Sequence, residues 1–221
     1  MTFVPAAEAA YIGGVSVRDM NRLVDEDLVP NSLFLLEGRS RRFTRLAAAF
    51  ARFFDQTEST LQANVRKSVL LELTNRVEQM KFDQDLVFSL RCEPSAVNWK
   101  VIVDAKIGLQ IDIAVFVTDA MFRAKAVDNA AQLVTEDSDV MGGQACFAGT
   151  RVPIDNVLAS LDKGIAKERL VASYPFLTDA HIDAARVYRQ VHPRRGRPPR
   201  LREANPLEFR KITRVTRPGK S

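Results

Sequence analysis

The sequence predicts a mainly helical α+β protein with four parts: residues 1–56, 57–137, 138–190 and 191–221. Apolar residues recur every three or four positions in several segments, which is typical of amphipathic helices. Two short hairpin patterns lie beside glycine-broken helices, and the last segment is rich in proline and arginine. Apolar residues make up 46% of the chain, which is enough to form hydrophobic cores.

Residues 5–30 predict two short helices separated by a glycine turn. Pro5 suits the start of the first helix, and Gly13-Gly14 ends it. Ser16 can cap a second helix, which Pro30 stops. The apolar face of this second helix comprises Val17, Met20, Leu23 and Val24.

A short hairpin follows the two helices. Leu33–Leu36 and Arg41–Thr44 have strand character and flank a turn at residues 37–40. The predicted order is therefore helix, turn, helix and hairpin wing. Residues 5–44 resemble the winged helix of MerR-type regulators, in which a Gly-Val-Ser turn also opens the second helix.

This unit carries the predicted DNA contacts. Arginine and asparagine read guanine and adenine edges in the major groove, and arginines on a wing contact phosphates. The alternative is an ordinary solvated surface. The predicted contacts are Ser16, Arg18, Asn21 and Arg22 on the helix and Arg39, Arg41 and Arg42 on the wing.

The central region has helical and strand patterns but no motif. We expect helices over 45–56, 59–80 and 118–134. Strands are predicted at Leu86–Leu90, Trp99–Val103 and, from its alternation, at 109–115. We interpret residues 57–137 as a connector and a possible dimer interface.

Residues 138–190 predict three short helices behind a small hairpin. Gly142-Gly143 allows a tight turn, and Thr150-Arg151-Val152 alternates as a strand does. Ile154 begins the first helix after Pro153, and Thr178 can cap the third. Arg151 either contacts phosphate or pairs with a neighbouring acid.

This segment resembles a small helix-turn-helix family known as a domain of unknown function. The matching positions are Gly142, Gly143, Gly149, Thr150, Arg151, Val152, Pro153, Gly164, Tyr174, Pro175, Leu177, Thr178, Ala184 and Ala185. Phe147 stands where the family usually has Ile, and Ala148 where it has Arg. Members with a MerR-like winged helix often act as VapB-type antitoxins beside PIN-domain ribonuclease toxins. The resemblance implies an antitoxin that binds such a toxin and represses its own operon.

The tail differs in charge from the rest of the chain. From Arg189 onward there are 11 lysines and arginines against two glutamates, a net charge of +9, and the preceding residues carry −4. Such a segment suits a polyanion or an acidic protein pocket, and we expect it to order on a partner. Arg194, Arg195, Gly196, Arg197, Pro198 and Arg200 also resemble an AT-hook, a minor-groove reader.

Three interpretations of the tail stay open: toxin binding, minor-groove binding and simple solubilisation. We favour toxin binding because apolar residues alternate with the charges, and arginines can occupy the Mg²⁺ site that PIN nucleases build from carboxylates. The predicted toxin-binding residues are Arg194, Arg195, Arg197, Arg200, Leu207, Phe209, Arg210, Lys211, Ile212, Arg214 and Arg217.

Enzymatic functions have little support in the sequence. His181 and His192 are the only histidines, no metal-ligand spacing occurs, and no nucleophile has an evident base. We therefore expect no catalytic residues, metal or cofactor. Without a secretion signal or a membrane span, we expect a cytoplasmic protein with reduced Cys92 and Cys146.

The preferred hypothesis is an antitoxin that binds operator DNA as a homodimer and blocks a PIN-domain ribonuclease with its tail. One alternative is a free-standing MerR-like transcription regulator, whose central region senses a ligand. The other is an adaptor that binds only protein.

Overall fold

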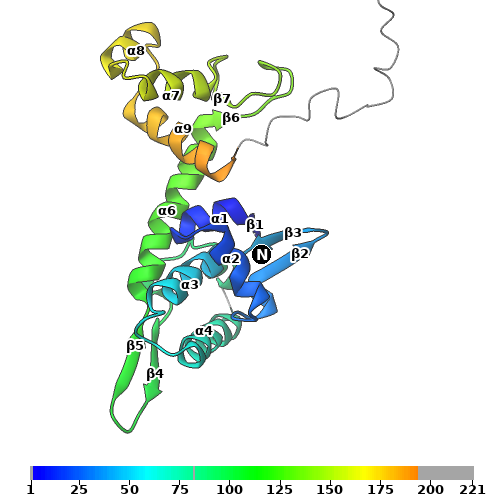
Figure 1. Cartoon of the computed structure of the whole chain (residues 1–221), viewed down its shortest axis with the longest axis vertical. Coiled ribbons are helices and arrows are strands. Elements are labelled where there is room, and N and C mark those ends of the chain that lie inside the picture. The colour runs from blue at the N-terminus through cyan, green and yellow to red at the C-terminus, as the bar shows by residue number, and fades with distance from the viewer. Residues whose placement is uncertain (1, 82, 194–221) are drawn as a thin grey trace, which may run out of the picture.

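The computed structural model describes residues 2–81 and 83–193, which form the predicted mainly helical α+β fold (Figure 1). The molecule is elongated, with a hairpin arm at one end, a helical body in the middle and a small second module at the other end. One long helix, α6 (Ala114–Leu133), runs from the arm to the second module. None of the helices described is both long and apolar enough to cross a bilayer.

The N-terminal unit is a winged helix-turn-helix. Helices α1 (Ala6–Gly13) and α2 (Val17–Asp25) flank the predicted glycine turn. Strands β2 (Phe34–Glu37) and β3 (Ser40–Phe43) form the predicted wing hairpin. A short strand that the sequence pattern did not indicate, β1 (Val4–Pro5), pairs antiparallel with β3, so the sheet order is β1-β3-β2.

Helix α3 (Arg45–Gln56) forms the centre of the first hydrophobic core. It packs against α1 and α6, so nearly all its side chains are buried, including Phe50 and Phe53. The predicted long helix is α4 (Ala63–Glu78), which buries Val69, Leu73 and Val77. This single core draws on residues from both the predicted 1–56 and 57–137 segments.

The strand predicted at Leu86–Leu90 is wrong, because this segment begins in helix α5 (Gln84–Phe88) and ends in a turn. The amide of Val87 donates to the Asp83 carbonyl and that of Ser89 to the Asp85 carbonyl, as in a helix. Val87 and Phe88 are buried, whereas Leu86 is largely exposed. A short apolar run fits either structure, and packing against α3 and α4 favours the helix.

The arm is an antiparallel hairpin of β4 (Lys100–Asp104) and β5 (Leu109–Asp112). The strand predicted over 109–115 is therefore too long. The Asp112 carboxylate accepts a hydrogen bond from the Ala114 amide, and α6 begins there. Trp99, just before the arm, is buried and donates its indole N–H to the Pro94 carbonyl.

The second module contains three short helices and a two-stranded sheet. The helices are α7 (Ile154–Asp162), α8 (Lys167–Ser173) and α9 (Asp179–Val191), and β6 (Val134–Thr135) pairs with β7 (Cys146–Phe147). The strand predicted at Thr150–Val152 is not regular. A tight turn at Gly149 brings the Val152 carbonyl to the Phe147 amide, which leaves only an isolated bridge between Cys146 and Pro153.

The modules are joined by packing and by ion pairs. Helix α9 packs against both α6 and α1. Within the body, the nearly buried Arg45 on α3 contacts Glu8 on α1 at 2.9 Å and Asp128 on α6 at 2.7 Å. Arg91 reaches the same Asp128 carboxylate at 3.3 Å. These charges fix α6 to the winged helix.

Candidate functional site

The turn between α1 and α2 is held by two arginines from other helices. Gly14 adopts the left-handed conformation that ends α1, with φ of 62°. Arg52 on α3 donates to the Gly14 carbonyl at 2.7 Å, and Arg123 on α6 donates to the Ile12 carbonyl at 2.6 Å. Cations at a helix C-terminus also complement its dipole. The sequence pattern did not reveal these residues, because they lie far along the chain from the turn.

Helix α2 begins with a capping box. The Asp19 amide donates to the Ser16 hydroxyl at 3.1 Å, and the Ser16 amide donates to the Asp19 carboxylate at 3.1 Å. The hydrogen bond from the Ser16 hydroxyl holds the pKa of the Asp19 carboxyl below its usual range. The side chain of Ser16, one of the predicted DNA contacts, therefore caps the N-terminus of α2.

Arg41 fastens the wing to α2. Its guanidinium contacts the Asp25 carboxylate at 2.5 Å and donates to the Asn21 carbonyl at 3.1 Å. The hydrogen bond that Arg41 donates to the Asp25 carboxylate lowers the pKa of Asp25. Arg42, the neighbouring wing residue, pairs with Glu37 at 2.8 Å. The wing and α2 thus form one continuous surface.

Acidic side chains neutralise part of this surface. Arg22 pairs with Glu26 at 2.6 Å and with Glu58 at 3.5 Å. Arg18, at the start of α2, and Arg39, at the wing tip, are exposed and form no hydrogen bond or ion pair with any described residue. A concavity of about 630 Å³ on this surface is lined by Ser16, Arg18, Asp19, Arg22, Asp25 and Glu26.

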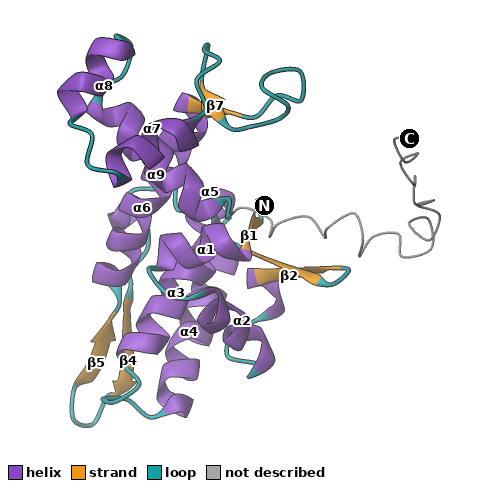
Figure 2. Cartoon of the chain, turned by 45° about the horizontal axis from the view of Figure 1, so that its top comes forward, coloured by secondary structure: helices purple, strands orange, loops and turns teal. Residues whose placement is uncertain are grey.

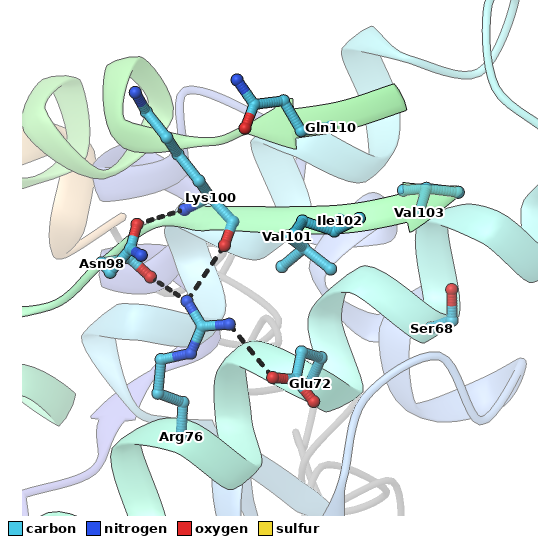
Figure 3. A pocket seen from close by; sticks show the side chains of 9 residues that line it. All are labelled: Ser68, Glu72, Arg76, Asn98, Lys100, Val101, Ile102, Val103 and Gln110. Atoms are coloured by element: carbon cyan, nitrogen blue, oxygen red, sulfur yellow. Dashed lines mark hydrogen bonds and ion pairs between the residues drawn. The ribbon is translucent and has the colours of Figure 1, made fainter. Parts of the chain in front are cut away.

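A second cleft lies between α4 and β4 and has a volume of about 600 Å³ (Figure 3). Arg76 on α4 crosses its floor, where it donates to the Asn98 and Lys100 carbonyls and pairs with Glu72 at 3.0 Å. The guanidinium of Arg76 is therefore already paired within the chain. None of the residues that line this cleft is a predicted DNA-binding or toxin-binding residue.

The second module presents different chemistry. Arg151 is exposed and forms no ion pair with a described residue, so the neighbouring-acid alternative has no support there. It lines a cavity of about 400 Å³ with Thr135 and Asp137.

Tyr188 packs edge-on against His192, with ring centroids 4.2 Å apart. Burial and the nearby Glu136 carboxylate raise the pKa of Tyr188 to about 12.

His181 contributes to the packing of this module. Its ring Nδ1 lies 2.8 Å from the hydroxyl of Thr178, the residue that caps α9. The same ring packs edge-on against Phe147 and Phe176, with centroids 5.8 and 5.7 Å away. Within the described part of the chain, no cluster of histidine, cysteine or acidic side chains could hold a metal ion.

The predicted toxin-binding residues all lie outside the described residues, which end at Pro193. Their side chains belong to the segment 194–221. The last described helix, α9, ends at Val191 beside a cleft of about 840 Å³. His192 and Pro193 line that cleft together with Glu136 and Tyr188.

Comparisons with known proteins found a matching family and a related protein. Residues 134–188, which include most of the second module, match the family described as "Protein of unknown function (DUF433)". The chain is similar to "Uncharacterized protein y4eO" of Sinorhizobium fredii (strain NBRC 101917 / NGR234), with 29% identity over 192 residues. The similarity covers 87% of this chain and 82% of the relative. No solved structure matches the chain.

Proposed function

We propose that the protein is a cytoplasmic DNA-binding antitoxin, which binds its operator through the winged helix and inhibits a PIN-domain ribonuclease through its tail. The observation that carries the DNA-binding half is the surface formed by α2 and the wing. Arg41 joins these elements through Asp25, so a recognition helix and a wing are held as one unit. A surface of this kind places a helix in the major groove and a hairpin on the flanking phosphates.

The charges of this surface refine the predicted contacts. Because Arg22, Arg41 and Arg42 already pair with carboxylates, they add little net positive charge. Arg18 and Arg39 are the predicted cations that remain unpaired within the described residues. We therefore assign base or phosphate contact on α2 to Arg18 and phosphate contact at the wing tip to Arg39.

The inhibitory half rests on the tail and on the resemblance to VapB-type antitoxins. Residues 194–221 contain ten lysines and arginines against two glutamates, with apolar residues such as Phe209 and Ile212 among them. A PIN-domain nuclease holds Mg²⁺ with clustered carboxylates, which arginine can pair with in a bidentate manner. The match to the DUF433 family covers residues 134–188 and carries no function of its own.

Fluorescence anisotropy with DNA from the protein's own upstream region tests the DNA-binding half. The intact protein should bind this DNA more tightly than a scrambled duplex. Replacing Arg18 or Arg39 by alanine removes one phosphate or base contact, so each should weaken binding and, for a phosphate contact, lower the salt slope by about 1. Arg186→Ala is a matched control, because Arg186 is an exposed arginine on α9 that pairs with Asp183.

Removal of residues 194–221 separates this proposal from the transcription-regulator alternative. Under the antitoxin proposal, the truncated protein keeps its operator specificity but loses nuclease inhibition. For a free-standing regulator, the truncation lowers DNA affinity and salt dependence, and no nuclease co-purifies with the intact chain. If the intact protein binds neither its upstream DNA nor a nuclease, the antitoxin proposal is wrong.

A further inference from the structure

The cleft at the end of α9 lies where the basic tail begins. In both views the second module forms one end of the molecule, with α9 on its side toward the body (Figures 1 and 2). Helix α9 ends at Val191, and the next two residues, His192 and Pro193, line the cleft of about 840 Å³. This volume lies within the range of clefts that hold ligands, roughly 300–1,000 Å³. The chain beyond Pro193 therefore starts on the wall of a cleft that is large enough for a short segment.

The lining of this α9 cleft favours a cation. Glu136, which directly follows β6, lines it together with Asp155 at the start of α7 and Tyr188 on α9. Glu136 is exposed and forms no ion pair with a described residue. The guanidinium of Arg189, also in the lining, already contacts Asp162 at 3.4 Å. The α9 cleft therefore offers the Glu136 carboxylate to a further cation, beside a tyrosine, a ring over which arginine can pack.

The first residues of the tail supply such cations. Residues 194–200 read RRGRPPR, with four arginines and no acidic residue. An extended chain advances at most about 3.6 Å per residue, so the Cα atoms of Arg194 and Arg195 lie within about 7 Å of that of Pro193. The long arginine side chains add to this reach. Arg194 and Arg195 therefore have access to the carboxylate in the cleft that Pro193 lines, without any change in the folded module.

We propose that the α9 cleft holds residues 194–200 of the same chain, with Arg194 and Arg195 against the Glu136 carboxylate. The tail then leaves the folded protein along the second module, and residues 201–217 form the part that reaches a partner. The four arginines of the docked segment, which the sequence analysis assigned to toxin binding, are held by the chain itself. The same docking covers the arginines that resemble an AT-hook.

The covalent attachment of the tail decides which segment fills the cleft. An arginine-rich segment of another protein offers the same chemistry, but it has to come from solution. Residues 194–200 are attached at Pro193, and a short tether gives an effective concentration in the millimolar range. A single exposed ion pair is weak by itself, so the tether is what populates the docked form, and a tightly binding partner still displaces it.

This inference goes beyond the proposed function, since it needs neither DNA nor a nuclease. Limited digestion of the purified full chain by trypsin is the test, because trypsin cleaves after arginine where the backbone is accessible. Cleavage after Arg195 reports on the docked segment, and cleavage after Arg214 reports on the rest of the tail. Mass spectrometry gives both rates in the same sample, so their ratio is independent of the activity of the trypsin. If docking exchanges faster than cleavage, the rate after Arg195 follows the population of the open form.

Three measurements of this ratio follow from the proposal. Glu136→Lys places a like charge beside Arg194 and Arg195, so cleavage after Arg195 relative to Arg214 should rise by about threefold or more. Raising the salt from about 0.05 to 0.5 M should raise the ratio for the wild type but not for this variant, because salt screens the ion pair. Asp139→Lys is the matched control, since Asp139 is exposed in the same loop but is not part of the cleft lining. This control should leave the ratio within about 1.5-fold of wild type.

The proposal is overturned if Glu136→Lys, with its fold verified by circular dichroism, leaves the ratio unchanged. If that variant does not fold, Glu136→Gln, which removes only the charge, gives the same comparison. An equal rise for Asp139→Lys would show a diffuse attraction by the acidic loop and would reject the α9 cleft as the docking site. DNA binding and nuclease inhibition are measured separately for each variant, so this proposal and the proposed function fail independently.

Discussion

Replacing Asp128 by asparagine should loosen the attachment of α6 to the winged helix. The Asp128 carboxylate receives Arg45 at 2.7 Å and Arg91 at 3.3 Å, and Arg45 has a side chain only 9% exposed. A hydrogen bond to a charged group contributes about 1.5–3 kcal/mol, and loss of a buried partner costs more. Glu8 still neutralises Arg45, and Asp128 is itself 31% exposed, so solvent screening reduces the loss. We expect about 1.5 kcal/mol less free energy of unfolding, or a Tm lower by about 3–6 °C.

Urea unfolding followed by tryptophan fluorescence measures this change, because Trp99 is the single tryptophan and is buried in the first core. Protein concentration must be held constant, since self-association shifts the apparent stability. Asp55→Asn is the matched control: Asp55 lies near the end of α3, is exposed, and forms no ion pair with a described residue. The same change of side chain there should alter the free energy of unfolding by less than about 0.5 kcal/mol.

The stabilisation that the Asp128 carboxylate provides depends on pH. Burial alone would raise the pKa of Asp128, but the hydrogen bonds from Arg45 and Arg91 outweigh burial and lower it. As the pH falls, the unfolded state therefore binds this proton first, near the usual aspartate pKa of about 3.9. The stabilisation by Asp128 is complete above that pH and is lost as the pH falls through the folded pKa. Equal stability of the Asp128 and Asp55 variants at neutral pH would refute this reasoning, as would a difference that persists in strong acid.

Three further predictions concern single side chains. Ser16→Ala removes the capping box of α2 and should lower the free energy of unfolding by about 1 kcal/mol in the same urea titration. The control Ser68→Ala, within α4, should change this free energy by less than half as much. The pKa of Tyr188 is raised to about 12 in the folded protein, so the unfolded state loses the phenol proton first as the pH rises. The free energy of unfolding should therefore fall between about pH 10 and 12, and Tyr188→Phe should remove this contribution when unfolding is measured across that pH range. Arg41→Met should speed amide hydrogen exchange of residues 34–43, because the wing loses its bonds to α2; unchanged exchange would show that Arg41 does not hold the wing.

Local patterns predicted much of the fold because each one reports a local physical preference. The glycine turn, the Ser16 cap and the spacing of Met20 and Leu23 correctly predicted α1, α2 and their order. Pro153 and Thr178 correctly marked the starts of α7 and α9. Helix starts and tight turns depend on a few neighbouring residues, so they can be inferred from one sequence.

Errors occurred where tertiary packing decides the structure. The apolar run at Leu86–Leu90 fits a strand or a short helix, and only contact with α3 and α4 settles the choice. The strand pairing of Val4 with Phe43 gives no local signal. The ion pairs of Arg22 with Glu58 and of Arg41 with Asp25 likewise join residues brought together by folding, so the sequence could nominate these arginines but not show these pairs. The pair of Arg22 with Glu26, four residues later, is a local one that helix spacing could have indicated.

The most direct test of the proposed antitoxin is nuclease inhibition by the full chain and by a chain ending at Pro193. Tagged protein is purified from its native host, and any bound PIN-type nuclease is identified by mass spectrometry and assayed for RNA cleavage with added Mg²⁺. The proposal predicts that the full chain retains and inhibits this nuclease, whereas the shortened chain binds its operator but releases an active enzyme. Recovery of the intact protein without a nuclease, or equal inhibition by the shortened chain, would contradict the role assigned to the tail.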